Sequence, residues 1–381
     1  MASTAAEEQI LTAQSLHSRT IILNRPRQLN ALSHLMNSRL QELYLKWEND
    51  NSVSVIVIKG TGRAFCSGGD VANVHNLGNS GQYSPAIRYF WDEYIMNYTL
   101  GTLKKPQVAL LNGIVMGGGA GISIHGMFRV ATEKTLFAMP ETALGLHPDV
   151  GASYFLSRLP GFLGEYVGLT GVRLDGVELV SCGLATHFVH SKRLHLLEEA
   201  LTKVETTDPN IVSLVIDGFF NEVSVKQDSA LHRLDIVDKC FSKETVEDIL
   251  SALELETNYV ADAWLKLAIQ SLKKASPVSL KITLRSIREG RRQCLHECLM
   301  REYRMTCHVV LRKICSDLYE GCRAILVDKD RNPKWNPEKL EHVTQDMVDH
   351  YFSPIGDGFK DLQLPVYERE SATQSHLQSK L

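Results

Sequence analysis

Two acidic side chains in an otherwise uncharged block are the residues of this sequence best suited to chemistry. Glu141 and Asp149 lie eight positions apart in the segment 137–151, and Gly145 and Pro148 between them rule out one regular helix. Carboxyl groups held in an apolar block suit general acid–base or nucleophilic catalysis. For Asp149 the alternative is a helix N-cap after Pro148, because Asp is a good capping residue.

Two glycine-rich turns could stabilise a negative charge with backbone N–H groups. Ser67-Gly68-Gly69 follows the β-branched run 53–58, and the turn at 116–119 with Gly118 follows the apolar run 107–111. Glycine lets a ligand approach the backbone closely, and two such turns are what a two-donor oxyanion hole requires. The G-x-G-x-x-G, P-loop and G-x-S-x-G patterns are absent from this segment, so phosphate binding and a serine nucleophile are disfavoured.

The second turn belongs to a run of 23 residues, 106–128, that contains no Asp, Glu, Lys or Arg. Its length would suit a membrane-spanning helix. The run contains six glycines, three of them consecutive, and such a sequence is a poor helix former. We therefore expect a buried strand followed by a glycine turn, and no membrane span.

The elements that must position these residues form a layered α/β pattern. Strands are expected at 19–23, 53–58 and 107–111, with a helix over 31–48, and this alternation predicts an α/β core. Beyond residue 205 amphipathic stretches dominate, at 243–255, 259–274, 278–288 and 295–311. We expect a core over 14–205, a mostly helical region over 206–352 and a polar tail over 353–381.

Composition excludes several classes of function. The 381 residues carry 41 Lys and Arg against 44 Asp and Glu, which argues against a generally basic nucleic-acid surface. Eight scattered cysteines without a C-x-x-C motif predict free thiols in a reducing compartment, and His187 and His190 lack a second ligand pair for a metal. Cys66 lies beside the first glycine turn, but no His and Asn pair accompanies it, so we expect an apolar filler.

The chain ends in Ser379-Lys380-Leu381. A terminal S-K-L is read by the peroxisomal import receptor, and the polar stretch before it would keep it accessible. The alternative is a chance tripeptide in a polar tail. We expect a peroxisomal protein that binds this receptor.

These motifs resemble the crotonase (enoyl-CoA hydratase/isomerase) superfamily. The resemblance is carried by Asn24–Leu32 (Asn-Arg-Pro-Arg-Gln-Leu-Asn-Ala-Leu), by Ala64–Asp70 and by Asn112–Gly119. The block 137–151, together with Asp92-Glu93-Tyr94 and the segments 279–285 and 320–330, is similar to the 3-hydroxyisobutyryl-CoA hydrolase branch. The resemblance implies a crotonase-like spiral of ββα units that binds acyl-CoA, with a mostly helical C-terminal region.

The resemblance also implies roles for individual residues. The N–H groups of Gly69 and Gly118, with Gly68 beside them, would hold the thioester oxygen, and Glu141 and Asp149 would be catalytic. Glu93 would bind substrate near the acyl hydroxyl, unless it is a solvated helix acid beside Asp92. Arg27, and more weakly Lys281 or Arg285, would contact the CoA phosphates. His125 and His147 are expected to be buried or supporting.

The chemistry depends on one departure from the hydratase pattern. Hydratases carry a second catalytic Glu shortly after the triple glycine, and here that position is Gly121. The resemblance therefore favours hydrolysis of a 3-hydroxyacyl-CoA, most simply 3-hydroxyisobutyryl-CoA in valine breakdown, without a metal or further cofactor. The alternatives are an enoyl-CoA hydratase or isomerase of β-oxidation, and a non-catalytic paralogue that binds acyl-CoA. Self-association into a homo-oligomer is left open.

Overall fold

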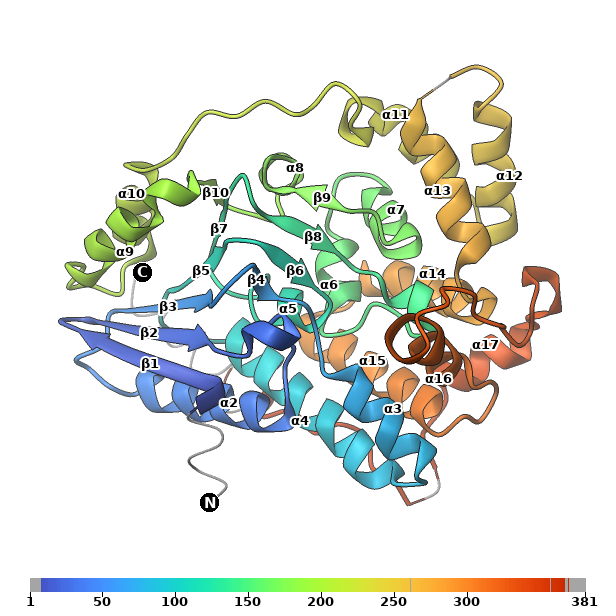
Figure 1. The fold of residues 1–381 in the computed structure, drawn as a ribbon, viewed down its shortest axis with the longest axis horizontal. Coiled ribbons are helices and arrows are strands. Elements are labelled where there is room, and N and C mark those ends of the chain that lie inside the picture. Colours follow the sequence, from blue (N-terminus) through green and yellow to red (C-terminus); the bar gives the residue numbers. More distant parts are fainter. Residues whose placement is uncertain (1–7, 261, 357, 367–368, 370–381) are drawn as a thin grey trace.

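The structure is a computed structural model that describes residues 8–260, 262–356, 358–366 and 369. In this part of the chain ten strands form two sheets with helices packed around them (Figure 1). The larger sheet has the order β1-β2-β3-β5-β7-β10, in which β1 and β2 are antiparallel and the other neighbours are parallel. Its strands are β1 (Ile10–Ser15), β2 (Ser18–Leu23), β3 (Val55–Gly60), β5 (Gln107–Leu111), β7 (Phe128–Ala131) and β10 (His187–Phe188).

The smaller sheet has the order β4-β6-β8-β9 and is what brings the site together. Its strands are β4 (Ala64–Cys66), β6 (Ile114–Met116), β8 (Leu136–Ala138) and β9 (Leu174–Asp175). The chain spirals, because β3, β5 and β7 lie in the larger sheet and the strand after each lies in the smaller one. Since β4, β6 and β8 are parallel neighbours, the segments that follow them meet at one edge.

Alternating side chains of the larger sheet face two different apolar layers. Val55 and Val57 of β3 pack with residues of α9 (Leu194–Thr202) and α10 (Pro209–Asp217), which cover the outer face (Figure 1). Ile56 and Ile58 face the opposite way, into the main core. The β-branched run therefore fits a sheet that is buried on both faces, as parallel strands usually are.

The remaining helices fall into an N-terminal and a C-terminal group. The first comprises α2 (His34–Glu48), α3 (Val71–Asn79), α4 (Tyr83–Gly101), α5 (Gly118–Gly121), α6 (Ala152–Leu156), α7 (Leu163–Thr170) and α8 (Gly176–Ser181). The second comprises α11 (Leu234–Phe241), α12 (Val246–Glu256), α13 (Ala263–Lys274), α14 (Pro277–Gly290), α15 (Leu295–Val310), α16 (Asp317–Cys322) and α17 (Gln345–Phe352). Short helical turns are η1 (Pro26–Gln28), η2 (Glu141–Leu144), η3 (Ser191–Arg193), η4 (Ala230–Arg233), η5 (Arg323–Val327) and η6 (Leu340–His342). The predicted α/β core and helical C-terminal region are confirmed.

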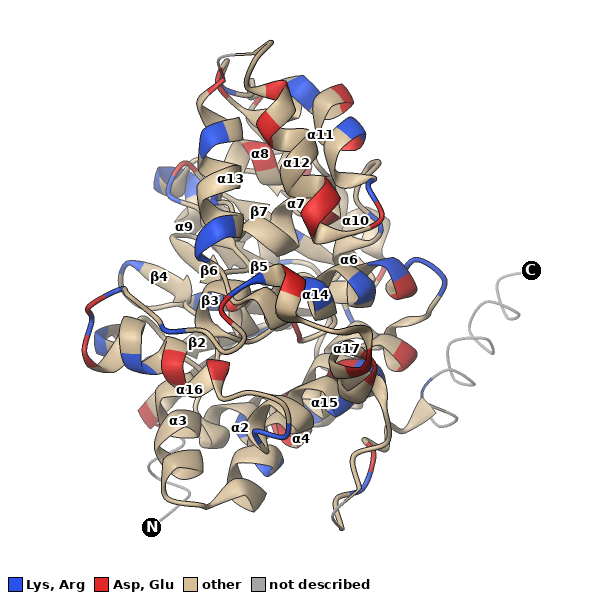
Figure 2. Ribbon diagram, turned by 90° about the vertical axis from the view of Figure 1, so that its right-hand side faces the viewer, with Lys and Arg blue, Asp and Glu red and all other residues tan. Residues whose placement is uncertain are grey.

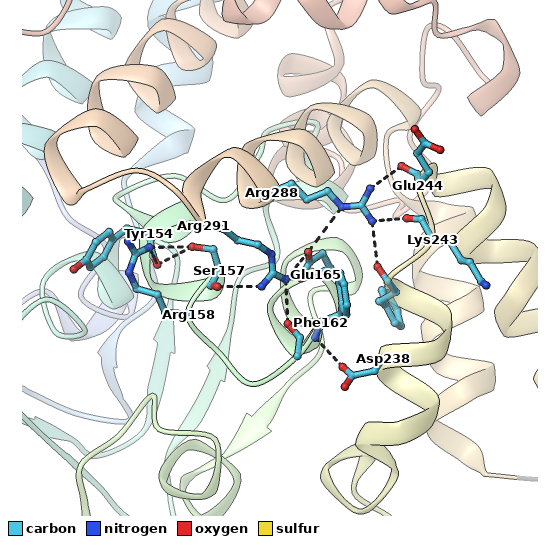
Figure 3. A network of polar contacts seen from close by, with 12 residues as sticks. Tyr154, Ser157, Arg158, Phe162, Glu165, Asp238, Lys243, Glu244, Arg288 and Arg291 are labelled. Carbon is cyan, nitrogen blue, oxygen red and sulfur yellow. Dashed lines mark hydrogen bonds and ion pairs between the residues drawn. The ribbon is translucent and has the colours of Figure 1, made fainter.

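Polar contacts, among them ion pairs to the buried carboxyl group of Glu165, join the C-terminal helices to the core (Figure 3). The Arg291 side chain donates to both carboxyl oxygens of Glu165 on α7 at 2.8 Å, and Glu165 is fully buried. Arg288 of α14 also lies 3.9 Å from the Glu165 carboxyl group, and the Phe162 N–H donates to the Asp238 carboxyl group of α11 at 2.8 Å. The helical region is therefore anchored by interactions that a loosely tethered appendage would lack.

The uncharged run 106–128 forms strand, turn and short helix, not one long helix. It supplies β5, β6 and α5 and ends at the start of β7. Among the described residues, no helix is long and apolar enough to cross a membrane. On the face shown in Figure 2, acidic and basic residues intermingle over α11, α12 and α13.

Candidate active site

A cavity of about 60 Å³ lies at the edge where the segments after β4, β6 and β8 meet. The cavity brings together residues that are up to 82 positions apart in the chain, between Ser67 and Asp149. Six of the seven predicted site residues line it, namely Gly68, Gly69, Glu93, Gly118, Glu141 and Asp149. The other lining residues are Ser67, Val71, Phe90, Gly117, Pro140, Leu144 and Leu146.

The two glycine turns place their amide groups side by side. A Cβ atom added to Gly118 would lie 3.0 Å from the backbone nitrogen of Gly69. Gly118 is the first residue of α5, so its N–H has no carbonyl acceptor within the helix. Gly69 is bridged to Leu32 through the backbone groups of residues 68 and 70, which leaves its own N–H outside that bridge. Two neighbouring amides of this kind can bind a carbonyl oxygen that gains negative charge.

Glu141 begins η2 directly after β8, and its carboxyl group faces the glycine turn. A Cβ atom added to Gly117 would lie 2.7 Å from Glu141 Oε1, while Oε2 is buried without a hydrogen-bond partner. Desolvation by burial, and then the negative charge of Asp149, raise the pKa of Glu141 well above its usual value. A carboxylate in this environment is a stronger base than one in water.

The C-terminal helices support the turn that carries Glu141. The Ser276 N–H donates to the backbone oxygen of Thr142, and the Ser276 hydroxyl donates to Asp317 of α16 at 2.6 Å. Gly145 has a φ of 73°, and a Cβ atom there would lie 2.2 Å from the Asp317 backbone. Glycine at 145 therefore permits both the left-handed turn and the close approach of α16.

Asp149 points away from the helix that follows it and toward α4. The Tyr94 hydroxyl lies 2.6 Å from Asp149 Oδ2 and donates to it when the carboxyl group is ionised, and Asp149 is only 5% exposed. Desolvation raises the pKa of Asp149 to about 7, against a lowering effect of the hydrogen bond from Tyr94. The N-cap interpretation does not hold, because α6 begins at Ala152 with Gly151 as N-cap and no side-chain cap. Its first N–H groups are satisfied instead by Glu302 of α15, which accepts from Gly151 at 2.6 Å and from Ser153 at 2.8 Å.

Val150, directly after Asp149, has a strained backbone, and its side chain packs where a side chain at position 121 would lie. Val150 has a φ of 56°, which a β-branched residue rarely adopts. Its backbone oxygen is 2.7 Å from His125 Nε2, and burial lowers the pKa of His125 to about 4, so a neutral imidazole donates. A Cβ atom on Gly121 would lie 2.7 Å from both Val150 Cβ and Asn97 Nδ2. The space in which hydratases carry their second acid is therefore filled by neighbouring side chains.

Glu93 is buried, which contradicts the alternative that it is a solvated helix acid. It is 2% exposed, and its Oε1 is buried without a hydrogen-bond partner. A Cβ atom on Gly118 would lie 2.6 Å from that oxygen. Desolvation and then the charge of Asp149 raise the pKa of Glu93 well above its usual value. The cavity thus holds three carboxyl groups, and mutual repulsion disfavours ionising all of them together.

The proposed cationic CoA contacts lie outside this cavity. Arg27 is exposed on η1. On α14, Lys281 pairs with Glu247 at 2.7 Å and Arg285 pairs with Glu289 at 2.7 Å. Cys66 is fully buried, and burial raises the pKa of its thiol to about 12, which keeps it neutral. No group of three His, Cys, Asp or Glu among the described residues is arranged to hold a metal ion.

Sequence reasoning missed the side chains that hold the acids in place. Tyr94 lies directly after Glu93, in the segment Asp92-Glu93-Tyr94 that resembles the hydrolase branch, and the sequence alone assigns it no role. Glu302 and Thr306 are four residues apart in a predicted helix, a spacing that places them on one face. A Glu and a Thr four residues apart within the amphipathic stretch 295–311 were the available signal in the sequence, and the structure shows that both are fully buried.

Known proteins are similar to this chain over most of its length. Residues 18–352 match the enoyl-CoA hydratase/isomerase family. The chain is 57% identical to 3-hydroxyisobutyryl-CoA hydrolase 1 of Arabidopsis thaliana over 361 residues, covering 95% of both proteins. It is also 46% identical to the small ribosomal subunit protein mS47 of the same plant, covering 96% of this chain and 90% of that protein.

Among solved structures, the chain is similar to a carnitinyl-CoA dehydratase from Mycobacterium thermoresistibile. The sequences are 34% identical, the TM-score is 0.85, and the match covers 94% of this chain and 99% of the other. The likeness extends through the C-terminal helices, since the match covers nearly the whole chain.

Proposed function

Since this chain belongs to the enoyl-CoA hydratase/isomerase family, we propose that it hydrolyses 3-hydroxyisobutyryl-CoA to 3-hydroxyisobutyrate and CoA, a step of valine breakdown. The observation that carries the proposal is the content of the cavity: Glu141 and Asp149 line it together with the paired glycine amides, while the place of the second hydratase acid is filled at Gly121. The 57% identity to a protein of that name supports the choice of acyl group.

In the proposed reaction the thioester oxygen lies between the N–H groups of Gly69 and Gly118. These amides polarise the carbonyl group and stabilise the charge that develops on its oxygen. Glu141 either attacks the carbonyl carbon to form a mixed anhydride, which water then opens, or removes a proton from the attacking water. In both routes the C–S bond breaks and the departing thiolate of CoA takes up a proton. The reaction consumes water and requires no cofactor beyond the CoA of the substrate.

Asp149 and Glu93 are proposed to select the acyl group. Both carboxyl groups line the same cavity as Glu141. A site that must hydrogen-bond a hydroxyl group discriminates strongly against analogues that lack one. We propose that they contact the 3-hydroxyl group, while Arg27 contacts the CoA phosphates from outside the cavity.

Release of free thiol from 3-hydroxyisobutyryl-CoA, followed with a thiol reagent, tests the proposal. We expect steady release by the wild-type protein and release at the background rate by Glu141→Gln. Equal thiol release with and without protein would refute a hydrolase. In that case, loss of enoyl absorbance without free thiol would identify a hydratase or isomerase, and binding of acyl-CoA without turnover would identify a non-catalytic paralogue.

We further propose that the protein acts in peroxisomes. The support is the terminal Ser379-Lys380-Leu381, which lies outside the described residues and would be read by the import receptor. A fluorescent protein fused before residue 1 should accumulate in peroxisomes, and the same fusion with one residue added after Leu381 should not. Diffuse fluorescence from the unmodified fusion would refute this assignment. Light scattering of the purified protein tests whether it forms the homo-oligomer that the resemblance allows.

A further inference from the structure

A buried series of hydrogen-bonding groups leads from Asp149 into the C-terminal helices. Asp149 Oδ2 lies 2.6 Å from the Tyr94 hydroxyl, which lies 2.8 Å from Thr306 Oγ1. Thr306 Oγ1 lies 3.3 Å from His147 Nε2, and His147 Nδ1 lies 3.1 Å from the backbone oxygen of Pro148. All four side chains are at most 5% exposed. Tyr94 and Asp149 come from the core, whereas Thr306 comes from α15.

The direction of these hydrogen bonds is constrained at one end. A backbone oxygen can only accept, so His147 Nδ1 must carry the hydrogen that faces Pro148. In a neutral imidazole Nε2 then accepts, and the Thr306 hydroxyl is its donor. Thr306 has one proton, so a filled contact between Thr306 and Tyr94 requires that the Tyr94 hydroxyl donate to Thr306. Tyr94 cannot then also donate to Asp149.

Counting protons identifies the states in which every contact is filled. When Asp149 is protonated and His147 is neutral, the four contacts contain four protons, and each group donates to the next. When Asp149 is ionised and His147 is neutral, three protons must serve four contacts, and two lone pairs face each other in one of them. When Asp149 is ionised and His147 carries the extra proton on Nε2, all four contacts are again filled. The three contacts between His147 Nε2 and Asp149 are then reversed, while His147 Nδ1 still donates to the Pro148 oxygen.

We propose that Asp149, Tyr94, Thr306 and His147 share one proton, so that Tyr94 and Thr306 are positioning residues that set the protonation state of Asp149. The proton passes between Asp149 and His147 by reversal of the hydroxyl groups between them, with no net change of charge. This inference rests on the proposed hydrolase function. Through Thr306, α15 then helps to keep Asp149 neutral before substrate binds. Asp149 Oδ1, which Tyr94 does not contact, is then a neutral acceptor for the substrate hydroxyl group.

The surroundings favour the state with the proton on Asp149. Glu93 of α4, Glu141 of η2 and Glu302 of α15 face this carboxyl group, and each opposes a further negative charge there. On the other side Arg301 of α15 disfavours a charged His147, and burial lowers the pKa of that imidazole to about 4. The burial that raises the pKa of Asp149 to about 7 acts in the same direction.

The test follows the infrared band of the protonated Asp149 carboxyl group, identified as the band that Asp149→Asn removes, as a function of pH. Thr306→Val removes one hydroxyl group and keeps the shape of the side chain, so Tyr94 is left free to donate to an ionised Asp149. We expect the midpoint to fall by about one pH unit, the size of one ordinary hydrogen bond. Thr306→Ser, the matched control, restores the hydroxyl group and should keep the wild-type midpoint. Tyr94→Phe removes the donor itself and should raise the midpoint.

An unchanged or raised midpoint in Thr306→Val would overturn the proposal, because it would mean that the Tyr94–Asp149 bond is independent of Thr306. A second measurement needs no variant at position 306. In the ¹⁵N-histidine-labelled wild-type protein, the His147 ring nitrogens should respond at the Asp149 midpoint, and a His147 signal that is flat through that midpoint would also overturn it. The pH profile of kcat/KM should shift as the infrared band does. If the wild-type protein releases no thiol, the proposed function fails, while the two spectroscopic measurements still decide whether the proton is shared.

Discussion

Gly121→Ala offers a strict test of how the site is built, because the perturbation is a single methyl group. The added Cβ would lie 2.7 Å from Val150 Cβ, 3.1 Å from Val150 Cγ2 and 2.7 Å from Asn97 Nδ2. Carbon atoms in contact prefer about 3.5–4.0 Å, so Val150 has to move by several tenths of an ångström or more. Val150 is already in a left-handed conformation and follows Asp149 directly, so its displacement carries the catalytic acid with it.

The magnitude follows from two opposing terms. Overpacking a filled core costs about 1–3 kcal/mol, whereas replacing glycine by alanine in helical backbone returns about 0.5–1 kcal/mol. We therefore expect the free energy of unfolding in urea to fall by about 1–2 kcal/mol. A displacement near 1 Å at a reacting group can cost about 100-fold in rate, so kcat for thiol release should fall by about 10- to 100-fold.

A matched control separates the clash from the general effect of alanine. Gly218 caps α10, is exposed, and a Cβ there would meet nothing closer than 3.5 Å. Gly218→Ala should therefore leave both the unfolding free energy and kcat near their wild-type values. Wild-type stability and kcat in Gly121→Ala would refute the argument, since they would show that the space beside Gly121 is open. Introducing the hydratase acid as Gly121→Glu would then be expected to succeed, whereas the present packing predicts that it disrupts the site.

Three further outcomes are expected. Glu141→Gln should lower kcat for thiol release by about 100-fold or more, since it removes the general base or nucleophile while keeping the shape; near-normal turnover would exclude that role. Asp149→Asn should become more stable than the wild type as the pH rises from 4 to 8, as measured by urea unfolding. Folding raises the pKa of Asp149 from 3.8 to about 7, so the unfolded wild-type chain releases this proton at a lower pH than the folded one. The wild type therefore loses stability across that window, and the Asn variant does not. The difference should approach a few kcal/mol above pH 7 and vanish below pH 4, and a pH-independent difference would show that the carboxyl group ionises normally in the fold. Glu302→Gln should lower the free energy of unfolding by about 1–2 kcal/mol, because one amide oxygen cannot accept from both Gly151 and Ser153 as the carboxylate does. The control is Glu297→Gln at the exposed start of α15, and equal losses in both variants would contradict a specific role for Glu302.

Local patterns were enough to predict the layers of the fold. The β-branched run 53–58 and the apolar run 107–111 form β3 and β5 because strands buried on both faces need such runs. The four amphipathic stretches beyond residue 240 form α12, α13, α14 and α15 within a few residues of the expected ends, since helix periodicity is a local property. The glycine turns and the two acids likewise stand out in the linear sequence, because an uncharged block with two carboxyl groups requires a chemical or structural reason.

The sequence by itself determined which groups the cavity contains: two glycine amides, Glu141, Asp149 and Glu93. Tertiary structure alone decided how those groups behave. Asp149 could have capped a helix, and only the approach of Tyr94 from α4 and Glu302 from α15 turned it into the cavity. In the sequence, Gly121 indicates only that the second acid of hydratases is absent. The packing shows in addition that Val150 and Asn97 fill the space that a side chain at this position would need. The physical reason is that pKa, strain and free volume depend on contacts between segments as far apart as residues 94 and 306, and no local pattern records which segments will meet.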